Sequence, residues 1–329
     1  MPKPFFLKCL MVPYLALSLS GCIGSDENSR DEDLDYKQLM RTFVQDLSSW
    51  AKTQSPGFLI IPQNGHELAT TTGETDGEAA TTFIASIDGA GQEDLFYGYG
   101  NDNQATPASD NNYLLNFLNI YEANGVEVLV TDYCSTPSLM DKSYTDNLSH
   151  SFISFAADHR NLDNIPTYPD LPHNVNSNNI TTLSEAQNFL YLLDTKAFSN
   201  KDAFTDALSA TNYDLFIIDL YVNDTALTKT DLHKLKQKAN GGTRLLICYM
   251  SIGEAEDYRY YWNSEWVKNP PAWLEKENPE WLGNYKVRYW QKDWQRIIFG
   301  NENSYLQKII EAGFDGVYLD IIEGFEYFE

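Results

Sequence analysis

The chain has 329 residues, of which 43% are hydrophobic and 14% aromatic, a composition that excludes a disordered or fibrous protein. Its 47 acidic side chains outnumber 23 lysines and arginines, and the formal net charge is −24. So acidic a surface repels phosphate backbones, which excludes nucleic acid as an expected partner and favours a cationic polymer. The alternative is that the acidic excess only keeps the protein soluble.

Residues 1–21 have the pattern of a secretory leader, with a lysine-containing start and an apolar stretch too short to span a bilayer. The stretch ends in Leu-Ser-Gly-Cys, which resembles the bacterial lipobox. We therefore expect Cys22 to be the lipid anchor and residues 22–35 to form an acidic tether. Ile23 replaces the aspartate of the inner-membrane retention signal, so we expect a lipid-anchored protein of the cell envelope, at the outer membrane. An ordinary signal peptide with a chance cysteine is the alternative.

From residue 36 onward, short β-type runs alternate with amphipathic helical stretches. Helical spacing is expected over residues 36–52, 112–123, 230–239 and 304–312. Strands are expected at residues 58–61, 83–87, 126–131, 151–155, 189–193, 214–219, 244–249 and 316–319. Most of these runs are continuously apolar, as in strands buried on both faces. Eight strands alternating with helices predict a (β/α)₈ TIM barrel over residues 36–329, with a doubly wound open sheet as the runner-up.

The element order is unusual, because a helix precedes the first strand and about ten residues follow the last one. In a closed barrel that helix could cover the last strand, so that the two ends of the chain would meet within one βα unit. This is the signature of a circular permutation. Truncation is the alternative interpretation.

Carboxylates or amides follow one predicted strand after another. In a barrel the reactive groups lie at these carboxyl ends. Any one of them alone would be a capping or solvated residue, but a ring of them is typical of glycoside cleavage, in which one acid protonates the leaving oxygen and another stabilises the transition state. No metal-ligand or cofactor motif accompanies them, so we expect neither a metal nor a cofactor. The polar strand-end residues are Asn64, Glu93, Asp132, Asp219, Glu254 and Asp320.

Six of the seven tryptophans fall between Trp262 and Trp294, interleaved with tyrosines and prolines. This composition predicts a long ordered loop, and such loops usually build a ligand cleft. Flat aromatic faces stack on sugar rings and attract ammonium groups. The rings could instead pack the loop onto the barrel, and we expect both uses.

Four segments together resemble a family hallmark. They are Tyr-Met-Ser-Ile-Gly-Glu-Ala-Glu-Asp-Tyr-Arg-Tyr-Tyr-Trp at 249–262, Trp-Leu-Gly-Asn-Tyr at 281–285, Gly-Phe-Asp-Gly-Val-Tyr-Leu-Asp at 313–320 and Ile-Pro-Gln-Asn-Gly at 61–65. They are similar to bacterial and archaeal proteins of the glycoside hydrolase family 114 type, the endo-α-1,4-polygalactosaminidase-like TIM barrels, some of them labelled cysteinyl-tRNA synthetase-related. In that family the segments like 249–262 and 313–320 come before the one like 61–65. The reversed order here supports the permutation.

By motif matching, Asp320 resembles the family's catalytic aspartate and Glu93 its catalytic glutamate. The resemblance implies Asp320 as nucleophile or charge stabiliser and Glu93 as general acid/base, although the two roles could be exchanged. It also implies a polysaccharide substrate, an α-1,4-linked galactosamine polymer that is partly free-amine and so cationic. A non-catalytic surface lipoprotein that only binds glycan is the second hypothesis, and the paired acids favour the enzyme. The predicted substrate-binding residues are Tyr249, Ser251, Glu254, Asp219, Asn64, Asp132, Tyr133 and Trp262.

Overall fold

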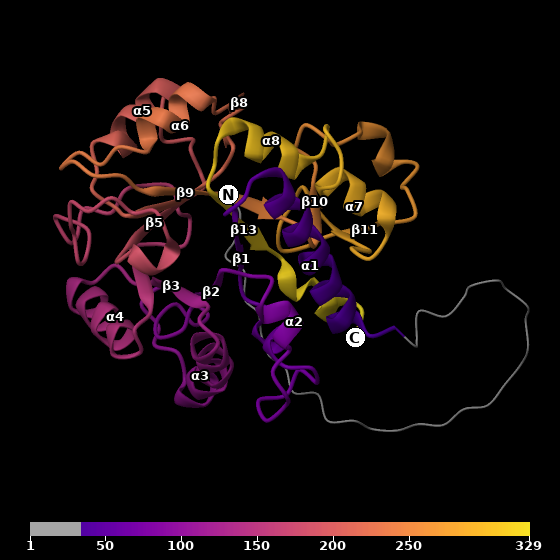
Figure 1. Ribbon diagram of the computed structural model, residues 1–329, viewed down its shortest axis with the longest axis horizontal. Helices are drawn as coiled ribbons and strands as arrows, with labels where there is room; N and C mark the ends of the chain where they lie inside the picture. Colours follow the sequence, from indigo (N-terminus) through magenta and orange to yellow (C-terminus); the bar gives the residue numbers. More distant parts are fainter. Residues whose placement is uncertain (1–33) are drawn as a thin grey trace, which may run out of the picture.

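The structure is a computed structural model that describes residues 34–329. It is a mixed α/β fold built on parallel sheets (Figure 1). One sheet has five strands in the order β1-β13-β9-β6-β5, and the other has three in the order β2-β3-β4. Every neighbouring pair in these two sheets is parallel. Their bounds are β1 (Leu59–Pro62), β2 (Gly89–Glu93), β3 (Glu127–Tyr133), β4 (Ile153–Ala157), β5 (Phe189–Leu192), β6 (Leu215–Ile218), β9 (Leu245–Ser251) and β13 (Gly316–Asp320).

The two sheets adjoin at both edges. At one edge Gln63, just past β1, forms a parallel bridge with Gly91 of β2, and the Asn64 N–H donates to the Gly91 carbonyl at 2.8 Å. At the other edge the rings of Phe155 in β4 and Phe189 in β5 pack with centroids 5.7 Å apart. Because both the pairs and the bridge are parallel, the carboxyl ends of all these strands lie at the same end of the molecule.

Helices lie around the outside of the strands, with α5 beside α6 and α1 beside α8 (Figure 1). The first of them shows why they form: the Asp35 carboxylate caps the Gln38 N–H at 2.8 Å, and an apolar stripe at helical spacing is buried against the strands. The helices are α1 (Tyr36–Gln54), α2 (Thr81–Ile84), α3 (Ala108–Ala123), α4 (Pro137–Ser149), α5 (Lys201–Ser209), α6 (Lys229–Leu235), α7 (Lys292–Ile298) and α8 (Tyr305–Ala312), with 3₁₀ turns η2 (His66–Ala69), η3 (Leu183–Glu185), η4 (Ser264–Val267) and η5 (Ile322–Tyr327).

The strand prediction for residues 83–87 is wrong. Residues 81–84 form the short helix α2, and the strand β2 begins only at Gly89. Its sequence, Gly-Ala-Gly-Gln-Glu, has low β propensity and no apolar run, so periodicity could not find it. The other predicted strands are confirmed to within a few residues.

The aromatic segment predicted as a loop is partly a sheet. Strands β10 (Glu254–Glu256), β12 (Asn284–Val287) and β11 (Leu274–Glu277) pair antiparallel in that order. Outside this segment, between β6 and α6, the two-residue strands β7 (Tyr221–Val222) and β8 (Thr225–Ala226) form a small hairpin. The long insertion after β9 is therefore an ordered subdomain with its own backbone hydrogen bonds.

The predicted leader 1–21, the proposed lipid anchor Cys22 and most of the tether 22–35 lie outside the described residues. Among residues 34–329, no helix combines the length and the apolar character needed to cross a bilayer.

A buried ion pair fixes the amino end of β6. Lys238 Nζ lies 2.8 Å from Asp214 Oδ1, and both side chains are 0% exposed. Asp214 Oδ2 also accepts hydrogen bonds from the Gln187 N–H at 2.9 Å and the Asn176 amide at 2.7 Å. One carboxylate thus ties together the long segment before β5, β6 and the segment after α6.

We predict that Lys238→Met lowers the free energy of unfolding by about 3–5 kcal/mol, because it leaves the Asp214 carboxylate buried without its counter-charge. Denaturant unfolding followed by circular dichroism measures this. Lys196→Met is the control: its ion pair with Asp194 has a lysine side chain that is 85% exposed, so the change should stay within about 0.5 kcal/mol. Equal effects of the two substitutions would contradict the prediction.

Candidate active site

Asp320 and Glu93 are the last residues of β13 and β2, the two strands that flank β1. Alternate residues of a strand share a face, and residues in register on parallel neighbours point the same way. Tyr249 and Ser251 of β9 are in register with Tyr318 and Asp320, so this group shares one face. The carboxyl ends of the strands thus bring the two predicted catalytic acids to one region.

Neutral donors surround the Glu93 side chain. The Tyr133 hydroxyl donates to Oε1, and the amides of Gln63 and Asn64 donate to Oε2, the latter at 3.3 Å. The Tyr191 hydroxyl in turn donates to Gln63 Oε1 at 3.1 Å, which fixes the orientation of that amide. Three donors on two oxygens fix the position and orientation of the Glu93 carboxyl group.

Asn64 also shapes the backbone beside Glu93. Its φ of 57° lies in the left-handed region, which asparagine adopts more readily than most residues. Its side-chain oxygen accepts the Glu93 N–H at 3.2 Å. Asn64 therefore joins the end of β1 to the end of β2, as well as contacting the carboxylate.

Arg160, which the sequence did not single out, supports Tyr133 from the far side. Its guanidinium carbon lies 4.0 Å from the centroid of the Tyr133 ring, and Nη2 lies 2.8 Å from Asp94 Oδ1. Burial raises the pKa of Asp94 to about 7, although the charge of Arg160 opposes this. The arginine thereby holds the ring whose hydroxyl contacts Glu93.

Asp320 has a different environment from Glu93. The Tyr249 hydroxyl donates to its Oδ2 at 2.5 Å, the one side-chain hydrogen bond recorded for this carboxyl group within residues 34–329. Burial raises the pKa of Asp320 to about 7, the Tyr249 hydrogen bond opposes the rise, and the negative charge of Glu93 adds to it. Near neutral pH Asp320 therefore carries a proton part of the time.

A third acid follows Asp320 in the turn η5. Burial raises the pKa of Glu323 well above its usual range, and the charge of Asp320 adds to this rise. Glu323 Oε2 is buried without a hydrogen-bond partner in the described structure. A neutral Glu323 beside Asp320 avoids placing a further negative charge there.

Asp219 reaches the same end of the strands but is held in an ion pair. Arg259 Nη1 lies 2.7 Å from Asp219 Oδ2, and Arg259 Nε lies 2.6 Å from Glu256 Oε2. Burial raises the pKa of Asp219, and the arginine lowers it. Asp219 is thus neutralised by a residue of the long insertion.

Glu254 and Ser251 lie inward of the surface. Glu254 is fully buried and accepts hydrogen bonds from Asn278 at 2.8 Å, Asn284 at 3.2 Å and Tyr327 at 3.0 Å. The Ser251 hydroxyl donates to the Glu254 carbonyl at 3.2 Å. Glu254 therefore anchors the insertion to the segment after β13, and its charge contributes to the raised pKa of Asp320.

The structure corrects the prediction that Asp132 lines a subsite. Adjacent residues of a strand point to opposite faces, so Asp132 points away from the face that carries Tyr133. Its carboxylate is 0% exposed and accepts four hydrogen bonds that tie the segment after β2 to α4. The donors are the N–H groups of Phe96 and Tyr97, the Ser143 hydroxyl and the Asn147 amide.

Trp262 belongs to the aromatic packing of the insertion. Its ring lies 4.7 Å from that of Tyr285 and 5.3 Å from that of Trp266, centroid to centroid. Trp266 continues the chain of contacts to Trp273 at 5.0 Å, which in turn lies 5.0 Å from Trp294. The rings therefore pack the insertion together, and Trp262 stays half-buried.

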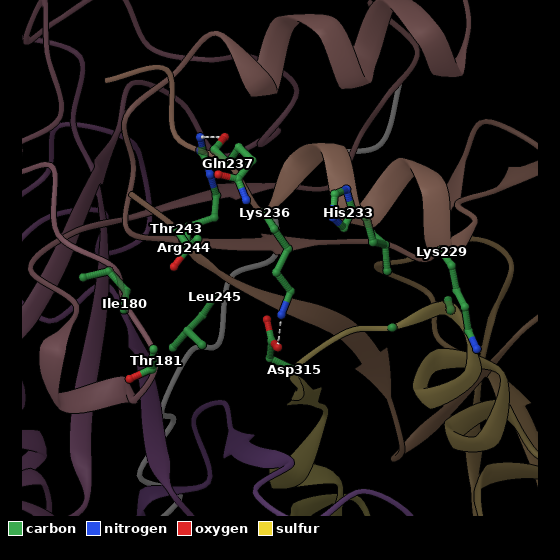
Figure 2. Close-up of a pocket in the computed structure, with 13 residues that line it drawn as sticks. Ile180, Thr181, Lys229, His233, Lys236, Gln237, Thr243, Arg244, Leu245 and Asp315 are labelled. Carbon is green, nitrogen blue, oxygen red and sulfur yellow. Dashed lines mark hydrogen bonds and ion pairs between the residues drawn. The ribbon is translucent and has the colours of Figure 1, made fainter. Parts of the chain in front are cut away.

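A cavity of about 470 Å³ lies at the other end of the strands (Figure 2). It is lined from α6 and from the residues just before β9 and β13, and an ion pair between Lys236 and Asp315 lies within it. These residues precede the strands that end in Ser251 and Asp320, so the cavity is separate from the two acids. Within the part of the chain that the structure describes, no three His, Cys, Asp or Glu side chains are grouped to hold a metal ion.

Two acids at the ends of β13 and β2, the strands that flank β1 in a parallel α/β fold, are the pair of residues that a glycoside hydrolase site requires. Residues 171–328 match the model of glycoside-hydrolase family GH114.

The chain is similar to three curated proteins, each named as uncharacterized. It is 44% identical over 177 residues to one from Methanocaldococcus jannaschii (54% of this chain and 49% of the relative), 33% over 147 residues to one from Thermotoga maritima (45% and 44%), and 37% over 121 residues to one from Deinococcus radiodurans (37% and 37%). The matched segments span about half the length of these relatives or less.

We predict that Asp320→Asn raises the melting temperature at pH 8 and leaves it unchanged at pH 4. The pKa of Asp320 rises from its ordinary 3.8 to about 7 on folding, so the folded state keeps a proton that the unfolded chain releases. Stability is therefore lost as the pH rises from about 4 to 7, and asparagine removes that loss.

Thermal melts of both proteins across this pH range measure the difference. Asp46→Asn on α1, where the carboxylate side chain is 48% exposed, should leave the melting temperature nearly unchanged at both pH values. A variant less stable than the wild type at pH 8 would refute the expectation.

Proposed function

We propose that the protein is a glycoside hydrolase that cleaves an α-1,4-linked galactosamine polysaccharide with Asp320 and Glu93. The observation that carries the proposal is the pairing of these two acids at the ends of β13 and β2, with different hydrogen-bond partners and a charge effect of Glu93 on Asp320. A glycosidase needs this difference, because one acid must hold a proton while the other is ionised.

The hydrogen bonds favour one assignment of the two roles. Asp320, with a pKa of about 7, holds a proton in neutral solution and fits the general acid. Glu93, whose two carboxyl oxygens accept three side-chain hydrogen bonds, fits the partner that stabilises or attacks the sugar cation. This assignment exchanges the roles that motif matching suggests first.

The closed and permuted (β/α)₈ barrel of residues 36–329 belongs to the same proposal. The parallel bridge between Gln63 and Gly91 and the packing of β4 against β5 support closure. Contact between α1 and the segment after β13 supports the permutation: Lys37 Nζ lies 2.6 Å from Glu329 Oε2. An open doubly wound sheet would leave β1 and β5 as edges.

The acidic charge balance supports a cationic amino sugar as the substrate. A net charge of magnitude about 2–8 is usual for a small soluble domain, whereas this chain carries −24. Tyr249, Asn64, Tyr133, Ser251 and Asp219 are the proposed subsite residues near the two acids. Trp262 and Glu254 are proposed as supports of the insertion that borders the site.

We propose that residues 1–21 are a lipoprotein leader, that Cys22 carries the lipid and that residues 22–35 tether the barrel to the outer membrane. The leader pattern and the lipobox-like sequence support this. Because Tyr36 at the start of α1 packs against Phe328, with ring centroids 5.5 Å apart, the tether would leave close to the strand that ends in Asp320.

The test is hydrolysis of a partly deacetylated α-1,4-galactosamine polymer by the full chain in detergent, with new reducing ends counted. Asp320→Asn and Glu93→Gln should each lower kcat by about 10²–10⁴-fold. Asp194→Asn, which changes a strand-end carboxylate whose partner is Lys196, is the matched control and should keep wild-type activity. Full activity in either acid variant would refute the assignment.

An aryl galactosaminide with a good leaving group separates the two roles. Such a leaving group needs no proton, so Asp320→Asn should regain activity on it while Glu93→Gln should not. The opposite outcome would restore the roles that motif matching suggests.

The second candidate is a glycan-binding lipoprotein without catalysis, favoured by the dense aromatic packing of the insertion. Retained binding of the polymer with no new reducing ends in the wild type would support it.

A further inference from the structure

Tyr318 lies directly beneath the two acids. It comes two residues before Asp320 on β13, so both side chains share a face. The side chain is 0% exposed, and its hydroxyl has no hydrogen-bond partner in the described structure. A buried hydroxyl left in this state costs about 1–3 kcal/mol, so a packing role alone would be filled better by phenylalanine.

The hydroxyl reaches from β13 across to β2. A Cβ atom placed on Gly91 would lie only 2.1 Å from the Tyr318 hydroxyl oxygen and 2.5 Å from its Cζ, so the phenol rests against a bare glycine backbone. Gly91 is two residues before Glu93 and on the same face of β2. The Tyr318 side chain therefore extends from β13, beneath Asp320, to β2, beneath Glu93.

The ring cannot easily move from this place. Tyr191 packs against it edge to face with centroids 5.3 Å apart, and the Tyr191 hydroxyl is itself bonded to Gln63. Burial and the charges of Glu93, Asp320 and Glu323 raise the pKa of Tyr318 well above its usual range. The hydroxyl thus stays protonated and remains a donor at any working pH.

We propose that Tyr318 is a positioning residue of the site, whose O–H group presents its positive end to Glu93 and Asp320 from below and stabilises the single negative charge that the two acids share. This inference rests on the proposed glycosidase function, but a titration of the two carboxyl groups can test it without hydrolysis of a glycan. Gly91 is required for this placement, because any side chain there would displace the Tyr318 hydroxyl.

The first experiment measures the carboxyl titrations of the full chain without substrate, by carbon NMR of labelled Asp and Glu side chains. In Tyr318→Phe we expect the apparent pKa values of the Asp320 and Glu93 pair to rise by about one unit, since the ionised form loses a donor dipole. Unchanged titrations would overturn the inference, whether or not the protein hydrolyses glycans.

Tyr305→Phe is the matched control. Its hydroxyl is also buried and without a partner in the described residues, but its ring packs against Tyr260 and Tyr261 of the insertion. It should leave the pair's titration within about 0.2 units of wild type, a small fraction of the usual spread. An equal shift in this control would overturn the inference, because the effect would then not belong to Tyr318.

Activity gives the second readout. In Tyr318→Phe the acidic limb of the kcat/KM profile against pH should move to higher pH by the same amount as the titration, with KM changed less than about twofold. A changed KM with an unmoved limb would make Tyr318 a packing residue and overturn the proposal. Shifted titrations in a wild type that lacks hydrolysis would refute the proposed function and keep the inference.

Gly91→Ala keeps the hydroxyl but displaces it. We expect the titration to shift in the same direction as in Tyr318→Phe. Gly324→Ala, where a Cβ would meet neighbours only at 3.5 Å or beyond, is its control for folding and should titrate as wild type. A folded Gly91→Ala protein with unshifted titrations would contradict the placement of the hydroxyl.

Discussion

The partial burial of two acids at strand ends that flank β1 is the constraint on which the rest of the site depends. Removing a carboxylate from water costs free energy that hydrogen bonds must offset, and two nearby carboxylates also repel each other. Here the ends of several strands supply the donors: Tyr133 and the amides of Gln63 and Asn64 for Glu93, and Tyr249 for Asp320. No single strand could satisfy both acids, so the site exists only when the sheets are assembled.

The unequal supply of donors is what makes the two acids chemically different. Three side chains donate to Glu93, whereas Tyr249 and the Ile321 backbone donate to Asp320, whose pKa burial raises to about 7. Residues further away maintain this difference, since Tyr191 orients Gln63 and Arg160 holds the Tyr133 ring. The insertion after β9 contributes through the buried Glu254, whose charge reaches Asp320.

For the aromatic insertion, composition alone predicts only part of what the rings do. Its tryptophans and tyrosines suggest sugar-stacking surfaces, yet the rings contact one another in a chain from Trp262 to Trp294 and stabilise a small antiparallel sheet. Both uses are compatible only for half-buried rings. The match of residues 171–328 to the GH114 family model agrees with a carbohydrate ligand, while the substrate and its cleavage are proposals.

Apolar periodicity and long motifs are local properties, so they sufficed to predict the alternation of strands and helices, the two acids at strand ends and the resemblance to the family. The sequence misplaced β2, whose Gly91 leaves room for the distant Tyr318, and it assigned Asp132 to a site from which its strand face turns it away. Only the assembled fold shows which donors meet Glu93, how strongly burial shifts the pKa of Asp320, and where the Tyr318 hydroxyl lies. These depend on strand register and on contacts between residues far apart in the chain, such as Tyr249 with Asp320, which no local pattern encodes.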